Sequence, residues 1–147
     1  MIGFKTSLAE GIARLLHDQH VGVYSTGAPY DPASSLPAIT LRKVPQEPDR
    51  LIALTVYPAS DAVGVPNSVV ALQVRCRWGG SDPRPADDLD DAVFAILQQF
   101  SGTLETDVKI AWCQRISGTP LGQDESGRYS VSSNYHVSAY WPTSNRI

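Results

Sequence analysis

Apolar residues recur at helical spacing in two segments of the chain. The first segment places five of them three or four positions apart, so that they share one helical face: Phe4, Leu8, Ile12, Leu15 and Leu16. Ser7 and Glu10 have the spacing of a capping box at its start, with a start near Gly3 as the alternative, and residues 20–22 suit its end. The pattern predicts an amphipathic helix at the beginning of the chain.

The second segment follows Pro83 and Pro85 and opens with a cluster of aspartates: Asp87, Asp88, Asp90 and Asp91. An apolar stripe runs along it: Leu89, Val93, Ile96, Leu97 and Phe100. We expect Gly102 to end this helix. The helix dipole favours negative charge in a first turn, and nothing nearby completes a calcium-binding loop. The aspartates therefore indicate a helix start rather than a metal site.

Two segments between the helices alternate apolar and polar residues, as strands do. Residues 51–57 and 69–78 are separated by Pro58 and a loop at 61–67, and we expect them to pair antiparallel. In the second strand the even-numbered residues from Val70 to Trp78 are apolar and face a core: Val70, Leu72, Val74, Cys76 and Trp78. Gln73, Arg75 and Arg77 lie on the other face, in water or at an interface.

The last third of the chain predicts a long C-terminal β-hairpin. Its arms are residues 108–116 and 128–141, and a polar segment at 117–127 joins them as a projecting tip. Together these elements predict a single α+β domain over residues 1–147. Each helix has one apolar stripe and needs a partner surface, so we expect both to pack on one face of a mixed or antiparallel sheet.

A proline-rich segment at about 25–37 interrupts this pattern. Pro29, Pro32 and Pro37 forbid a helix there and disfavour a central strand. Loops of this length in a small domain are commonly functional or packed against a partner. The segment is therefore either an arm that reaches a neighbouring molecule or an ordered loop on the surface.

Composition and charge narrow the class of protein. Of the 147 residues 42% are apolar and 18% are charged, as in soluble globular domains. The net charge of -3 gives no overall basic field, so tight sequence-specific DNA binding is not expected. The chain starts without a secretory pattern, and no stretch approaches the roughly 20 apolar residues of a membrane span. We therefore expect a protein that is made and used in a cytoplasm and makes no membrane contact.

No complete catalytic or metal-binding constellation can be assembled from the sequence. It contains no nucleophile elbow, phosphate-binding loop or dinucleotide-binding glycine motif. His17 and His20 have the spacing of a metal pair, but no third ligand accompanies them, and a helix end also favours imidazoles. Cys76 and Cys113, each in a predicted strand, are interpreted as buried free thiols. We expect no catalytic residue, metal or cofactor.

Three arginines lie close to a tryptophan in the sequence: Arg75, Arg77 and Arg84, beside Trp78. Basic and aromatic residues together occur in nucleic-acid sites. Arginines that alternate on the wet face of a sheet more often form salt bridges, within the domain or across a subunit contact. We favour the salt-bridge interpretation.

Three local patterns occur together along the chain. They are Gln73-Val74-Arg75 with Arg77, the acid-opened helix that follows, and Leu121-Gly122-Gln123-Asp124 with Gly127-Arg128 and Asn134-Tyr135. In this order and spacing, from the N-terminal helix to the final strand, the chain resembles the tail terminator proteins of phages with long non-contractile tails. These proteins are also called minor capsid proteins. The proline-rich segment is the part that matches least.

The resemblance implies a small structural subunit that is not an enzyme. Such subunits form a six-fold ring on the end of the tail tube, which stops tube growth and provides the face that joins the head. The implied partners are further copies in a hexamer, the tail tube protein, head-tail connector proteins and DNA that passes through the channel without sequence-specific binding. The implied location is the virion, at the head-tail junction, after assembly in the host cytoplasm.

The resemblance supplies no list of functional residues. Candidates for the subunit interface therefore come from exposed polarity and position: Arg75, Arg77, Asp124, Arg128 and Tyr30. The nearest alternative functions are another head-tail connector, such as a head-completion or stopper protein, and a tail tube subunit. The alternatives of a different class are a small cytoplasmic enzyme that uses His17 and His20, and a ligand-binding module.

Overall fold

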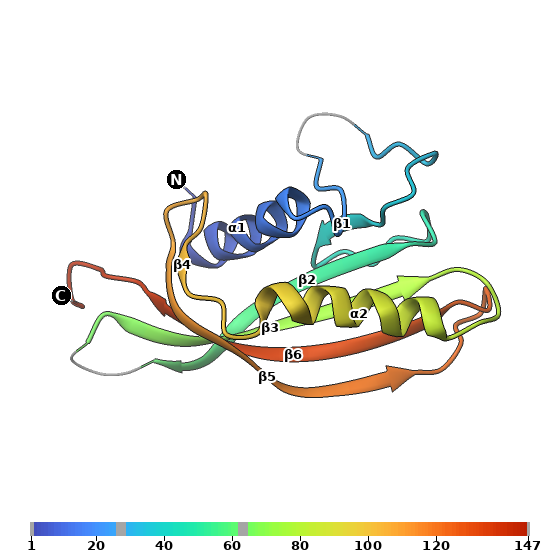
Figure 1. Ribbon diagram of the computed structural model, residues 1–147. Helices are drawn as coiled ribbons and strands as arrows, with labels where there is room; N and C mark the ends of the chain where they lie inside the picture. Colours follow the sequence, from blue (N-terminus) through green and yellow to red (C-terminus); the bar gives the residue numbers. More distant parts are fainter. Residues whose placement is uncertain (1, 26–28, 62–64, 147) are drawn as a thin grey trace.

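The computed structural model describes residues 2–25, 29–61 and 65–146 (Figure 1). In chain order these residues form α1 (Phe4–Asp18), β1 (Ala38–Leu41), β2 (Leu51–Asp61), β3 (Asn67–Trp78), α2 (Arg84–Leu97), β4 (Gly102–Thr103), β5 (Lys109–Leu121) and β6 (Tyr129–Tyr140). The predicted α+β class is confirmed. Part of the predicted loop at 61–67, residues 62–64, lies outside the described residues, as do residues 26–28 of the proline-rich segment.

The six strands form one mixed sheet in the order β1-β2-β3-β6-β5-β4. β1 runs parallel to β2, and the other neighbouring strands pair antiparallel. The predicted antiparallel pairing of the two strands between the helices is confirmed, with Leu72 of β3 opposite Val56 of β2. On its other side Leu72 lies opposite Tyr135 of β6, so β3 and β6 occupy the centre of the sheet.

The core forms where apolar residues of both helices meet alternate residues of the central strands. From the helices come Leu8, Ile12 and Leu16 of α1, and Leu89, Val93 and Leu97 of α2. From the strands come Ile52, Leu54, Val70, Leu72, Val74, Cys76, Tyr135 and Val137. Burial of each large apolar side chain contributes on the order of 1.5–3 kcal/mol. Both cysteines are free and buried, as predicted.

The helix ends differ from the sequence prediction. α1 begins after Gly3, and the backbone N–H of Ser7 donates to the Gly3 carbonyl at 3.0 Å, so Ser7 lies inside the helix and the capping-box prediction is wrong. α2 ends at Leu97 and not at Gly102. Gln98 turns to extended backbone, and the N–H of Gln99 donates to the Cys113 carbonyl of β5 at 2.8 Å. This hydrogen bond to β5 thus replaces the backbone hydrogen bond that would continue the helix.

The C-terminal strand pair also departs from the predicted bounds. Residues 117–121 were expected in the connecting segment, but β5 runs on to Leu121 and pairs with residues 130–134 of β6. A register shift between Arg115 and Ser117 lets the strand continue. β4 pairs only with Lys109 and Ile110, so Pro120 lies on a sheet edge, where no N–H is needed for a further strand.

Candidate functional site

The face of the sheet that does not contribute to the helix-packed core is largely polar. Cross-strand pairing aligns its residues in rows, for example Thr55, Gln73, Asn134 and Ser117, and next to them Ala53, Arg75, Ser132 and Thr119. We call this surface the open face. A sheet face of small polar residues is suited to water or to a polar partner, and it leaves room for contacts with another protein.

One end of the open face carries exposed aromatic residues. Tyr57, Trp112 and Tyr140 keep 46%, 41% and 45% of their surface exposed. The ammonium group of Lys109 lies 6.0 Å from the centre of the Tyr140 ring. Exposed tyrosine and tryptophan are typical of the energetic centres of protein interfaces. This end therefore has the composition of a protein-binding surface.

At the opposite end, two arginines that were predicted to lie at an exposed interface are buried. Arg77 is 2% exposed and Arg128 is 5% exposed. The guanidinium of Arg77 donates to the carbonyl oxygens of Asp49 at 3.0 Å, Pro45 at 2.7 Å and Pro48 at 2.7 Å. Of the two expectations for Arg77, water or an interface, exposure to water is wrong, because the loop at 42–50 folds over this end of the open face and needs its carbonyls paired.

Arg128 holds the same loop from the neighbouring strand end. Its guanidinium donates to the Gln46 carbonyl and lies 3.3 Å from an Asp49 carboxylate oxygen. Its Nε also forms an ion pair with Asp124 at 2.8 Å. Backbone N–H groups of Ser126 and Arg128 donate to the Asp124 carboxylate at 3.0 and 2.9 Å. The N–H of Arg128, followed by its side chain, lowers the pKa of Asp124, and the carboxylate organises the hairpin turn.

Four of the five predicted interface residues are brought together around one groove. It has a volume of about 370 Å³, and its lining residues are Val44, Gln46, Arg75, Arg77, Asp124, Glu125, Ser126 and Arg128. Tyr30, the fifth, packs against Ala38, Leu51 and Ala53, and its hydroxyl donates to the Leu36 carbonyl. Their role in a subunit interface stays a prediction.

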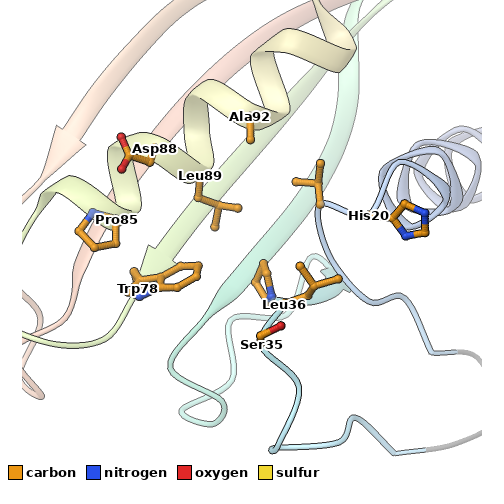
Figure 2. Close-up of a pocket in the computed structure, with 10 residues that line it drawn as sticks. His20, Ser35, Leu36, Trp78, Pro85, Asp88, Leu89 and Ala92 are labelled. Atoms are coloured by element: carbon orange, nitrogen blue, oxygen red, sulfur yellow. The ribbon is translucent and has the colours of Figure 1, made fainter.

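The proline-rich segment packs on its own chain over the part that is described. Arg50 donates to the Ser35 carbonyl at 2.9 Å, and its guanidinium carbon lies 5.0 Å from the centre of the Trp78 ring. Behind this contact is an apolar groove of about 370 Å³ between the segment and α2 (Figure 2). Figure 2 shows Trp78, Leu36 and Leu89 around it, with Asp88 at the α2 side. The groove is large enough for an apolar side chain.

Residues 15–141 match the family described as bacteriophage tail terminator protein. The chain belongs to this family. A tail terminator protein is a structural component of the phage tail, so the chain is a virion protein and not an enzyme.

Comparison with solved structures supports the fold. A chain of the virion of a native gene transfer agent particle has a TM-score of 0.55 with this tail terminator protein at 14% sequence identity. The alignment covers 69% of this chain and 78% of the other. No match was found among curated proteins. At this identity the likeness establishes a shared fold.

One buried acid of this tail terminator protein was missed by sequence reasoning. Asp90 was assigned to the charged start of α2, but only Asp87 of the cluster lies in the first turn, and Asp90 is 6% exposed. Ser133 donates to its carboxylate at 2.7 Å, and Arg115 lies 3.4 Å from it. Burial raises its pKa, against the effects of Ser133 and Arg115. Its position three residues before Val93, on the apolar stripe, was the available signal.

The histidines make no shared site in the part of the chain that is described. Nδ1 of His17 accepts a hydrogen bond from the backbone N–H of Tyr24 at 3.1 Å, and His20 lines the apolar groove. Among residues 2–25, 29–61 and 65–146 there is no group of three His, Cys, Asp or Glu residues that could hold a metal ion. No described helix is long and apolar enough to cross a membrane.

Proposed function

We propose that this tail terminator protein assembles head-to-tail into a closed ring of six copies that caps the tail tube, ends its elongation and provides the surface to which the head joins. The partners in this proposal are further copies of the chain, the tail tube protein and the head-tail connector proteins. The observation that carries the proposal is the two-sided construction of the subunit, which packs both helices into one core and leaves a polar face with an exposed aromatic end.

The two edges of the sheet support association with unlike surfaces. β1 pairs only with residues 51–54 of β2, so residues 55–61 extend past it. At the other edge β4 pairs only with Lys109 and Ile110 of β5, and Gln98 and Gln99, which follow α2, form hydrogen bonds with the backbone of Arg115 and Cys113. Exposed strand edges invite pairing with other chains. Because the two edges differ, they suit heterologous contacts, which close into a ring when the rotation between copies permits.

The charge of the subunit suits a channel for DNA. A net charge of -3 provides little attraction for the phosphate backbone. A channel that held many phosphates through basic residues would retain the DNA, because each such contact adds to the binding free energy. In the proposed ring, DNA passes through the centre without sequence-specific contacts.

The test is removal of the gene from its phage, followed by electron microscopy of the particles. We expect overlong tails, or tails of finished appearance that fail to join heads, and supplying the gene in trans should restore normal particles. Absence of tubes would instead indicate a tube subunit. Tails of normal length attached to heads would refute the terminator role.

Purified components give an independent measurement. Native mass spectrometry of the protein mixed with tail tubes should detect six copies at a tube end, and added protein should shorten tubes grown in vitro. Growth to the same length with and without the protein would contradict the capping proposal.

A further inference from the structure

Arg75 has hydrogen-bond donors that its own chain does not use. It lies on β3 on the open face, two residues before Arg77, and lines the groove described above. Within residues 2–25, 29–61 and 65–146 its side chain forms no hydrogen bond or ion pair, and its Nε is screened from solvent without a partner. A buried donor without a partner costs about 1–3 kcal/mol. A carboxylate in the groove would instead pair with the terminal nitrogens of the same guanidinium, which the described residues also leave unused.

The charges around Arg75 favour a single carboxylate over a polyanion. Arg77 and Arg128 add positive charge, and both use their guanidinium groups to hold the loop at 42–50. Burial, and next the charge of Arg128, lower the pKa of Arg77. Asp124 and Glu125 also line the groove and would repel a run of phosphates. Asp124 is paired with Arg128 at 2.8 Å, which leaves Glu125 as the rim acid.

The chain carries matching acids on another surface. Asp87, Asp88 and Asp91 of α2 are exposed, and no ion pair within the described part of the chain involves them. We call these three residues the acidic ridge. α2 packs on the core side of the sheet, whereas Arg75 lies on the open face, so the ridge and the groove of one chain lie on opposite sides of the sheet and do not pair with each other.

We propose that Arg75 binds a carboxylate of the acidic ridge of a neighbouring copy, and that this contact is one of the joints of the ring. The inference rests on the proposed ring function and specifies which surfaces meet. Groove and ridge are different patches of the same chain, so their pairing is heterologous and directs head-to-tail assembly rather than a symmetric dimer. Planar guanidinium groups bind carboxylates through two parallel hydrogen bonds, which also fixes the orientation of the neighbour.

Charge exchange in the full-length chain tests the contact. The first variant is Arg75→Glu, and the second replaces the whole ridge as Asp87→Lys, Asp88→Lys and Asp91→Lys. Ring formation on tail tubes is measured by native mass spectrometry and sedimentation at low and high salt. Each variant alone should assemble more weakly by about tenfold or more. An equimolar mixture of the two should recover assembly. In a ring of alternating copies, every second joint places the glutamate of one variant opposite the lysines of the other, and the remaining joints keep the native pairing of Arg75 with the aspartates.

The controls distinguish loss of the Arg75 contact from misfolding of a variant and from failure of the proposed ring. Lys5→Glu reverses one exposed charge on α1 and should leave assembly unchanged, and circular dichroism with urea unfolding checks the fold of every variant. If Arg75→Glu assembles like the wild type, or if the mixture does not recover, the Arg75 contact is refuted while capping by the wild type still stands. If the wild-type protein neither forms rings nor caps tubes, the proposed function itself fails. Rings that form normally but retain DNA differently would assign Arg75 to the channel and overturn the joint.

Discussion

Replacement of Arg77 by methionine should destabilise the fold by releasing the loop that covers this end of the sheet. Arg77 donates to three backbone carbonyls of the loop at 42–50, and its side chain is 2% exposed. Methionine keeps much of the volume of the side chain and removes its donors. The carbonyls of Pro45, Pro48 and Asp49 would then lose the partner that closes the loop onto the sheet.

The magnitude follows from these three bonds. Hydrogen bonds that involve a charged group contribute about 1.5–3 kcal/mol each, which gives a gross loss of about 5–9 kcal/mol. Removal of the buried guanidinium also removes its desolvation cost of several kcal/mol, and the freed carbonyls at the loop can bind water. We expect a net loss of about 3 kcal/mol in the free energy of unfolding.

Urea unfolding followed by tryptophan fluorescence measures the global effect, and limited trypsin digestion measures the local one. Lys43 lies exposed in the loop, so its peptide bond should be cut faster when the loop is released. Hydrogen exchange at residues 42–50 should rise, while exchange in the centre of β3 changes only through the global loss of stability.

Arg75→Met is the matched control, because Arg75 lies on the same face of the same strand and makes no hydrogen bond or ion pair in the described part of the chain. It should not lower the free energy of unfolding, and it should raise it by up to about 1–3 kcal/mol, because it removes a screened donor that has no partner. Equal losses in the two variants, or a loss below about 1 kcal/mol for Arg77→Met, would refute the argument that Arg77 secures the loop.

Three further predictions concern buried residues. Leu72→Ala should lower the free energy of unfolding by about 2–5 kcal/mol, because it leaves a cavity at the centre of the sheet. The control Tyr57→Ala, at an exposed residue, should lower it by less than about 1 kcal/mol. Equal effects of the two substitutions in urea unfolding would place the core elsewhere. Because burial raises the pKa of Asp90, the folded wild type binds that proton more tightly than the unfolded chain, and it loses stability as pH rises above the ordinary value of 3.8. Asp90→Asn should therefore be at least as stable as the wild type at pH 7, with its relative advantage falling toward pH 4; an advantage that grows on acidification would contradict this. Burial raises the pKa of Cys113 to about 12 and that of Cys76 well above its ordinary value. An alkylating reagent at pH 8 should therefore label neither thiol in the native protein and both thiols in urea. Rapid labelling of the native protein would exclude their burial.

The two helices, the two long strands between them and the core residues were predictable from the sequence, whereas the short strand β1 was not. Ile12, Val93 and Leu72 lie on stripes whose period of 3.6 or 2 residues is set by the local backbone geometry, and the same residues are fully buried in the structure. The family could also be inferred, from the order of short patterns along most of the chain, and the family match confirms it.

The roles of the polar residues depended on the tertiary structure. Arg77 was predicted on a wet face because strand alternation places it opposite the core, but its partner Pro48 comes from 29 positions away. Asp90 was counted with its acidic neighbours in α2, yet it bonds to Ser133, 43 positions away. Residues 117–121 have the composition of a loop, and they form a strand because they pair with β6.

The difference has a physical cause. Apolar burial is non-directional, so a periodic stripe is enough to show which side of an element turns inward. A hydrogen bond or ion pair requires a particular atom at about 3 Å, and which atom arrives there is decided only when distant segments pack. The sequence by itself therefore determined the two helices, the four long strands and the core of this tail terminator protein. Only the tertiary structure decided where the short strands β1 and β4 form, which charged groups are paired inside the chain and which, like Arg75, are left for a partner.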